Sequence, residues 1–200
     1  KTRALACSPG HDGACVTVSE LASGADGIPG VVADWKLQLD VWPRATRGAE
    51  VDVGFYRLPG HRDTSVDAVC SLANPATYPG CERAAGKVAE DKARDKNRDH
   101  PVFDTVTHRR MHPFDFCALS FERHGFWAKE TVGFVKKLAH SRAAALGLEP
   151  STEIQRWYAA ISCCLQRSNA KILRGEPVPG RPTPPPSRFT ATGRDLRFVA

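Results

Sequence analysis

The stretch "HRDTSVDAVCSL", residues 61–72, places a carboxylate inside an apolar strand pattern. Val66, Ala68 and Cys70 alternate with polar or variable residues, which is typical of a half-buried strand. Asp67 stands in the middle of this alternation, although aspartate is among the residues least common in strands. A residue that opposes its local structure indicates a role beyond folding.

The neighbouring segments predict a sheet around this strand. Alternating apolar residues predict two earlier strands, "VVADWKLQLDVW" (31–42) and "EVDVGFYR" (50–57). Downstream, the pattern predicts a charged helix over 81–100, a strand over 112–122, and helices over 126–146 and 151–174. This order predicts an α/β (α+β) fold in which a small mixed β-sheet is flanked by helices, with further helices at the C-terminus.

The composition divides the chain into three parts. Residues 1–30 are rich in Gly, Ala, Ser and Pro, and we expect an irregular N-terminal segment there. Residues 31–174 carry the predicted strands and helices and form the expected folded domain. Residues 175–200 are proline-rich and basic, which indicates an extended tail.

The charge of the chain favours an anionic partner. The 200 residues carry a formal net charge of +6. Seven basic and two acidic residues lie between Arg167 and Ala200, so this end of the chain alone carries +5. Such a distribution favours DNA or RNA as a partner. Because no apolar run approaches the roughly 20 residues of a membrane helix, we expect no membrane span.

The cysteines indicate a reducing environment. Seven cysteines is an odd number, and they are scattered rather than arranged as a disulfide framework, so we expect an intracellular protein. Cys7, His11 and Cys15 resemble part of a zinc site. Their spacing fits no common zinc finger and a fourth ligand is missing, so we expect a loop rather than a structural Zn²⁺ site.

Two acids in adjacent predicted strands are the best candidates for chemistry. Asp52 and Asp67 lie in strands joined by a short turn, and cross-strand neighbours approach closely in an antiparallel pair. Two adjacent carboxylates repel each other unless a cation lies between them. Mg²⁺ or Mn²⁺ with one or two carboxylate ligands suits phosphodiester cleavage. The alternative is that both acids are simply solvated at the strand ends.

A lysine beside such a pair would stabilise charge that develops on a phosphate. The charged helix that follows offers Lys87, Lys92 and Lys96, of which the last two are four residues apart and share a face. Glu122, at the end of the next predicted strand, is a candidate outer ligand or a support for the ligands. The alternative is that these lysines face water.

Five runs resemble a known family: "EVDVGFY", "SVDAVCSLANP", "KVAEDKARDKN", "FDFCALSFERHGFWAKETVGFVKKLA" and, as a closing helix, "RWYAAISCCLQRSNAKIL". They are similar to the restriction-like endonuclease region of non-LTR retrotransposon polyproteins, which belongs to the PD-(D/E)XK nuclease superfamily. The likeness covers about residues 48–174. In that family, the region lies downstream of a reverse transcriptase, and its core is a small mixed sheet flanked by helices.

The resemblance implies Mg²⁺-dependent nicking of DNA, a nuclear location and membership of a larger polyprotein or assembly. Carried over to this chain, it implies that Asp52 and Asp67 are the metal ligands. It also implies that Lys92 or Lys96 is the lysine of the site, displaced onto the helix. Glu122 occupies the glutamate position of the family's closing segment.

The sequence departs from the family pattern at two places. Glu50-Val51-Asp52 stands where the family has Arg-Pro-Asp, and Lys96 is followed four residues later by His100 instead of tyrosine. A catalytically inactive nucleic-acid-binding domain of the same fold is therefore one alternative. A structural domain within a larger assembly is another. Only the nuclease requires the two aspartates to lie together with a lysine directed at them.

Overall fold

The computed structural model describes residues 9–39, 49–104, 106–111 and 114–174. For residues 9–12, 34–39 and 49–50 only the backbone is described. The expected proline-rich basic tail over 175–200 lies outside the described residues.

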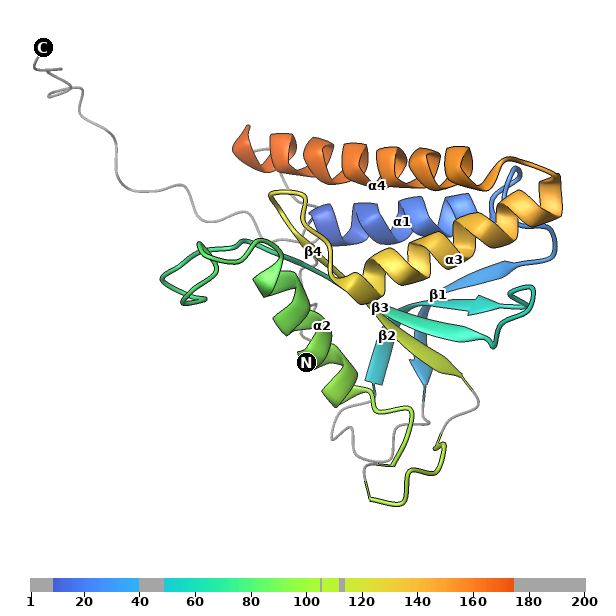
Figure 1. The fold of residues 1–200 in the computed structure, drawn as a ribbon, viewed down its shortest axis with the longest axis horizontal. Coiled ribbons are helices and arrows are strands. Elements are labelled where there is room, and N and C mark those ends of the chain that lie inside the picture. The colour runs from blue at the N-terminus through green and yellow to red at the C-terminus, as the bar shows by residue number, and fades with distance from the viewer. Residues whose placement is uncertain (1–8, 40–48, 105, 112–113, 175–200) are drawn as a thin grey trace, which may run out of the picture.

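The strands form one four-stranded mixed sheet with the order β1-β2-β3-β4 (Figure 1). The strands are β1 (Val32–Leu39), β2 (Ala49–Tyr56), β3 (Thr64–Ser71) and β4 (Asp115–Glu122). Strand β2 runs antiparallel to both β1 and β3, whereas β4 runs parallel to β3. Every predicted strand is present.

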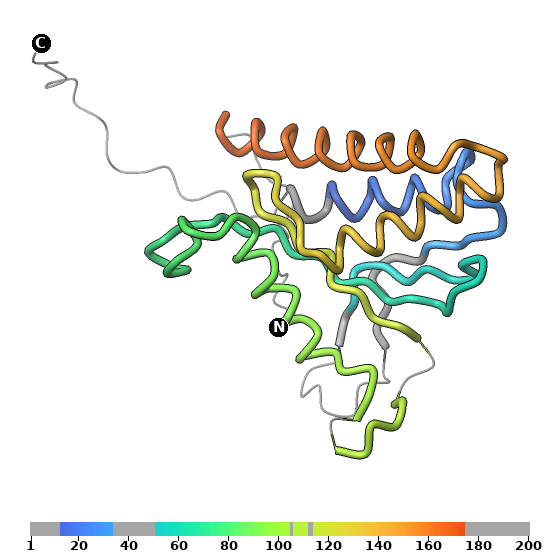
Figure 2. Tube along the Cα trace, viewed as in Figure 1, coloured from blue at the N-terminus to red at the C-terminus, as the bar shows by residue number. Residues whose placement is uncertain are grey.

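Helix α2 (Lys87–Asp99) connects the two parallel strands, as a parallel pair requires. Figure 2 shows the chain passing from β3 through α2 into β4. The helix begins later than the pattern predicts, because residues 81–86 form turns that end at Gly86 with φ 78°. This positive φ favours glycine, which has no Cβ to clash.

Three further helices lie together, away from α2 (Figure 1). They are α1 (Pro9–Ser23), α3 (Lys129–Leu146) and α4 (Pro150–Leu173). Helices α1 and α3 contact the strands, and α4 packs against both helices. The expectation of a mixed sheet flanked by helices, with helices at the C-terminus, is therefore confirmed.

The two faces of strand β3 pack against different helices. Val66 and Ala68 are buried in the larger hydrophobic core, with residues of α1, α3 and α4. A smaller core joins α2 to the sheet through Ala89, Ala93 and others. Because side chains alternate along a strand, Asp67 faces the α2 layer while its neighbours fill the main core.

The expectation of an irregular N-terminal segment is wrong for α1. Its small residues indicated a loop, but they allow close packing against α4. A Cβ added at Gly13 would lie 2.6 Å from the Cys164 sulfur, closer than real Cβ atoms come. Ala14 and Ala22 are fully buried in the main core. The glycine and alanines are therefore contact residues of a helix rather than signs of a loop.

The described part of the chain contains no helix with the length and hydrophobicity needed to span a membrane. All cysteines recorded there are free thiols. Of the three residues that resemble part of a zinc site, Cys7 lies outside the described residues, the side chain of His11 is not described, and Cys15 is buried in the core.

Candidate active site

The two candidate aspartates lie where β2 and β3 separate. The antiparallel register between these strands ends at the pair Val53–Val66, so Asp52 and Asp67 follow at the point of divergence. The Ala68 backbone N–H donates to the Asp52 carboxylate at 2.7 Å. This side-chain acceptor satisfies a strand N–H where the backbone ladder has ended.

Asp67 is a buried acid with a cationic partner. Its exposed fraction is 6%, and its Oδ2 lies 2.5 Å from the Lys96 Nζ on α2. Burial raises the pKa of Asp67 to about 6, although the Lys96 ammonium opposes this rise. The Asp52 carboxylate contributes to the same rise, because it repels a second negative charge and accepts a hydrogen bond from the protonated acid.

Of the two lysines on the predicted face, only Lys96 reaches the acid pair. The Lys92 ammonium instead lies 3.7 Å from Asp95 and 5.4 Å from the centre of the Tyr78 ring. The structure therefore brings together Asp52, Asp67 and Lys96 and leaves Lys92 apart.

Glu122 does not join this group, because its contacts lie at the other end of α2. Its Oε1 accepts hydrogen bonds from the backbone N–H groups of Val88 at 2.9 Å and Ala89 at 3.3 Å. The N-cap residue of α2 is Gly86, which has no side chain to satisfy these donors. Glu122 therefore supplies from β4 the cap that α2 lacks, in place of the ligand or support role expected from the sequence.

His100 follows α2 directly and lies close to the site. Its ring stacks on Phe116 with centroids 4.7 Å apart, and its Nδ1 lies 3.1 Å from the Lys96 carbonyl oxygen. Burial lowers the pKa of His100, and the nearby Asp52 is among the groups that raise it. His100 is therefore part of the same neighbourhood as Asp52 and Lys96.

Two further residues near the site escaped the sequence analysis. The Glu130 Oε1 accepts the Ala118 N–H at 3.2 Å, and its Oε2 accepts the side-chain amide of Asn97 at 2.5 Å. Asn97 follows Lys96 in the sequence, and Ala118 is the register partner of Asp67. Since these contacts join residues at least 12 positions apart, no local pattern predicted them.

Among the residues that the structure describes, potential metal ligands are few around the acid pair. These described residues contain no cluster of three or more His, Cys, Asp or Glu side chains able to hold a metal ion. A pair of carboxylates is nevertheless the usual protein contribution to a Mg²⁺ site, since water and substrate phosphate supply the other oxygens.

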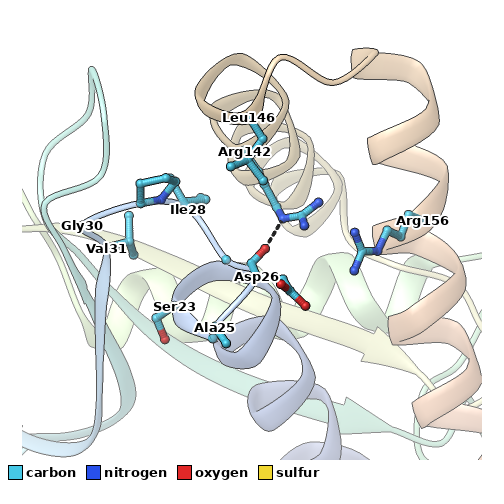
Figure 3. Close-up of a pocket in the computed structure, with 12 residues that line it drawn as sticks. Ser23, Ala25, Asp26, Ile28, Gly30, Val31, Arg142, Leu146 and Arg156 are labelled. Atoms are coloured by element: carbon cyan, nitrogen blue, oxygen red, sulfur yellow. Dashed lines mark hydrogen bonds between the residues drawn. The ribbon is translucent and has the colours of Figure 1, made fainter.

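A separate pocket lies between the loop after α1 and helices α3 and α4 (Figure 3). Arg142 and Arg156 are among its lining residues, and the Arg142 Nε donates to the Asp26 carbonyl at 2.7 Å. The buried carboxylate of Glu153 accepts hydrogen bonds from Arg142 and the Trp157 indole. These contacts connect elements of the fold, and none of the candidate site residues lines the pocket.

No protein-family model matches the sequence, and a comparison with curated proteins found no significant match. The arrangement of Asp52, Asp67 and Lys96 therefore carries the functional conclusion.

Proposed function

We propose that this chain is a metal-dependent DNA endonuclease-like domain that nicks phosphodiester bonds. Asp52 and Asp67 are the proposed metal ligands, and Lys96 is the proposed lysine of the site. The supporting observation is the meeting of two carboxylates and one ammonium where β2 and β3 diverge.

The chemistry of the acid pair fits Mg²⁺ or Mn²⁺. Both side chains offer carboxylate oxygens, which these cations prefer as ligands. The raised pKa of Asp67 means that its charge remains costly even beside Lys96. A divalent cation near both acids would lower that cost. When bound, the metal would neutralise charge on a substrate phosphate and make a coordinated water more acidic.

The residues of the chain have separate tasks in this proposal. The Lys96 side chain is 30% exposed, so a substrate can reach it, whereas that of Asp67 is 8% exposed. An ammonium has three N–H donors, so Lys96 can contact Asp67 and also donate to a phosphate oxygen. The Asp52 carboxylate is oriented by the Ala68 N–H.

We further propose that the domain derives from the restriction-like endonuclease region of a non-LTR retrotransposon, within the PD-(D/E)XK superfamily. The order of the elements from β2 to β4 and the lysine on α2 support this origin. A nuclear location and a larger polyprotein or assembly as its context are parts of the same proposal.

One observation favours the alternative of a non-catalytic nucleic-acid-binding or structural domain. Lys96 already contacts Asp67, so the buried acid has a partner without any metal. A binding domain of this kind would hold DNA without nicking it, and its affinity would fall steeply as the salt concentration rises.

A plasmid-nicking assay with Mg²⁺ or Mn²⁺ tests the proposed activity. We expect the wild type to convert supercoiled DNA to the nicked form. Asp67→Asn and Lys96→Met should each slow nicking by a factor of about 100 or more, as loss of a group that stabilises transition-state charge does.

The matched control for the lysine is Lys87→Met. Lys87 lies on the same helix and contacts Asp91 at the same distance of 2.5 Å, but it takes no part in the acid pair. This variant should nick at the wild-type rate. Absence of nicking by the wild type, or equal rates for wild type and Asp67→Asn, would refute the nuclease.

A further inference from the structure

Glu130 connects the helix and the strand that form the candidate site. Its carboxylate accepts the Ala118 N–H on β4 with one oxygen and the Asn97 amide on α2 with the other. Ala118 lies beside Asp67 in the parallel register, and Asn97 is adjacent to Lys96. One side chain on α3 therefore spans the same two elements that the Lys96–Asp67 contact spans.

The surroundings of Glu130 make this contact specific. Burial raises the pKa of its carboxyl, and hydrogen bonds from Asn97, Ala118 and Cys117 oppose the rise. A half-buried carboxylate that loses such donors pays a desolvation cost, so the native geometry around it is strongly preferred. Movement of the Asn97 turn away from β4 would break the contact.

Different side chains contact the two ends of α2. Glu122 caps the first turn, and the Glu90 side chain accepts the Lys129 N–H at 2.8 Å, which ties the first half of α2 to the start of α3. Glu130 acts on the last turn of α2, where both Lys96 and Asn97 lie.

We propose that Glu130 and Asn97 are positioning residues that hold the Lys96 ammonium on Asp67. The importance of this position for catalysis rests on the function proposed above. The positioning itself does not, because it is a property of the folded chain.

The hydrogen bond between Asn97 and Glu130 can be kept while the amide and the carboxylate exchange places. Asn97→Asp places a second carboxylate against Glu130, so the two repel each other and the turn that carries Lys96 shifts. Adding Glu130→Gln restores the contact: the new amide oxygen still accepts the Ala118 N–H, and the new NH₂ donates to the carboxylate at position 97. Because both variants carry the same aspartate, the comparison isolates the contact from the added charge.

The readout is the rate at which an amine-acylating reagent labels each lysine of the intact chain, followed by mass spectrometry. Lys96 and Lys92 have nearly equal exposed fractions, 30% and 31%, on the same helix. In the wild type, we expect Lys96 to be labelled more slowly than Lys92, because its Nζ lies 2.5 Å from the Asp67 carboxylate and is held there by a charge-assisted hydrogen bond.

Asn97→Asp should accelerate labelling of Lys96 by roughly threefold to tenfold, as expected for losing an ion pair of ordinary strength, and should leave Lys92 unchanged. The double variant should return Lys96 to the wild-type rate. A general loss of stability would instead accelerate the labelling of both Lys96 and Lys92. Unchanged labelling of Lys96 in Asn97→Asp, or no recovery in the double variant, would overturn the positioning role.

Nicking rates measured on the same samples separate the two proposals. If the wild type does not nick but the labelling pattern is as expected, the positioning role stands and the nuclease fails. If the wild type nicks while Asn97→Asp leaves both the Lys96 labelling and the nicking rate unchanged, the nuclease stands and the positioning role fails.

Discussion

At the scale of single residues, Asp67 destabilises the strand in which it lies. A buried acid beside another acid opposes folding even with a lysine nearby, and its pKa is raised accordingly. Titratable groups whose pKa is shifted by burial together with a like charge are enriched at functional sites. Asp67 therefore lowers the stability of the fold, which indicates that this position serves chemistry instead.

This destabilisation predicts how stability depends on pH. The pKa of Asp67 is about 6 in the folded protein against a usual value of 3.8. Between these values, the folded state binds more protons than the unfolded state. The free energy of unfolding therefore falls as the pH rises from about 4 to about 6, by roughly 2 kcal/mol for this group. Asp67→Asn should abolish this contribution.

Urea unfolding of wild type and Asp67→Asn across this pH range measures the effect. The control is Asp91→Asn, because hydrogen bonding to Lys87 lowers the pKa of Asp91, which gives a pH dependence of the opposite sign. If the free energy of unfolding varied with pH in the same way in wild type and Asp67→Asn, Asp67 would not carry the raised pKa.

At the scale of the elements, the position of α2 depends on carboxylates that belong to other elements. Glu122 from β4 caps its first turn, and Glu130 from α3 holds its last turns. In return, Glu90 from α2 accepts the first N–H of α3. These contacts between distant residues fix the helix that carries Lys96 against the strand that carries Asp67.

Removing the cap should destabilise the fold. Glu122→Ala leaves the buried N–H groups of Val88 and Ala89 without their acceptor, so we expect the free energy of unfolding to fall by about 2–4 kcal/mol. Glu122→Gln keeps an acceptor oxygen, so its free energy of unfolding should fall by less. Urea unfolding and amide hydrogen exchange at these two residues measure the change. If Glu122→Ala weakened Mn²⁺ binding without changing either measurement, Glu122 would be a ligand instead.

At the scale of the whole molecule, Arg142 joins three parts of the chain. From α3 it donates to the Asp26 carbonyl in the loop after α1 (Figure 3). It also donates to Glu153 on α4. The Arg142 and Glu153 side chains are 4% and 3% exposed, so the pair is buried. Removing one partner would leave an uncompensated charge inside the protein.

Arg142→Met should lower the free energy of unfolding by about 3–5 kcal/mol, because buried Glu153 then loses its counter-charge. Arg156→Met is the control: its guanidinium lies 3.9 Å from Glu153, but the side chain is 52% exposed, so we expect a loss below about 1 kcal/mol. Chemical denaturation of both variants gives the comparison. Equal losses would contradict the central role of Arg142.

The sequence predicted the parts of this fold that follow from local periodicity. Alternation predicted β1 to β4, and helical spacing predicted α2 to α4. Helix α1 was missed, because the same small residues serve both loops and close helix packing, and only the presence of α4 distinguishes the two. A mid-strand aspartate was a local signal for the site.

The contacts around that site were beyond local patterns. Lys92 and Lys96 share a helix face, so only the position of α2 along the sheet brings Lys96, rather than Lys92, to Asp67. The roles of Glu122 and Glu130 depend on which backbone N–H groups the fold leaves without partners nearby. Such donors are known only once the elements have been assembled.

The most direct test of the proposed centre is a Mn²⁺ titration followed by electron paramagnetic resonance, which measures the free ion. The account predicts one bound Mn²⁺ in the wild type and in Asp91→Asn, and strongly weakened binding in Asp52→Asn and Asp67→Asn. No binding by the wild type, or equal binding by all four proteins, would contradict the claim that Asp52 and Asp67 form a metal site.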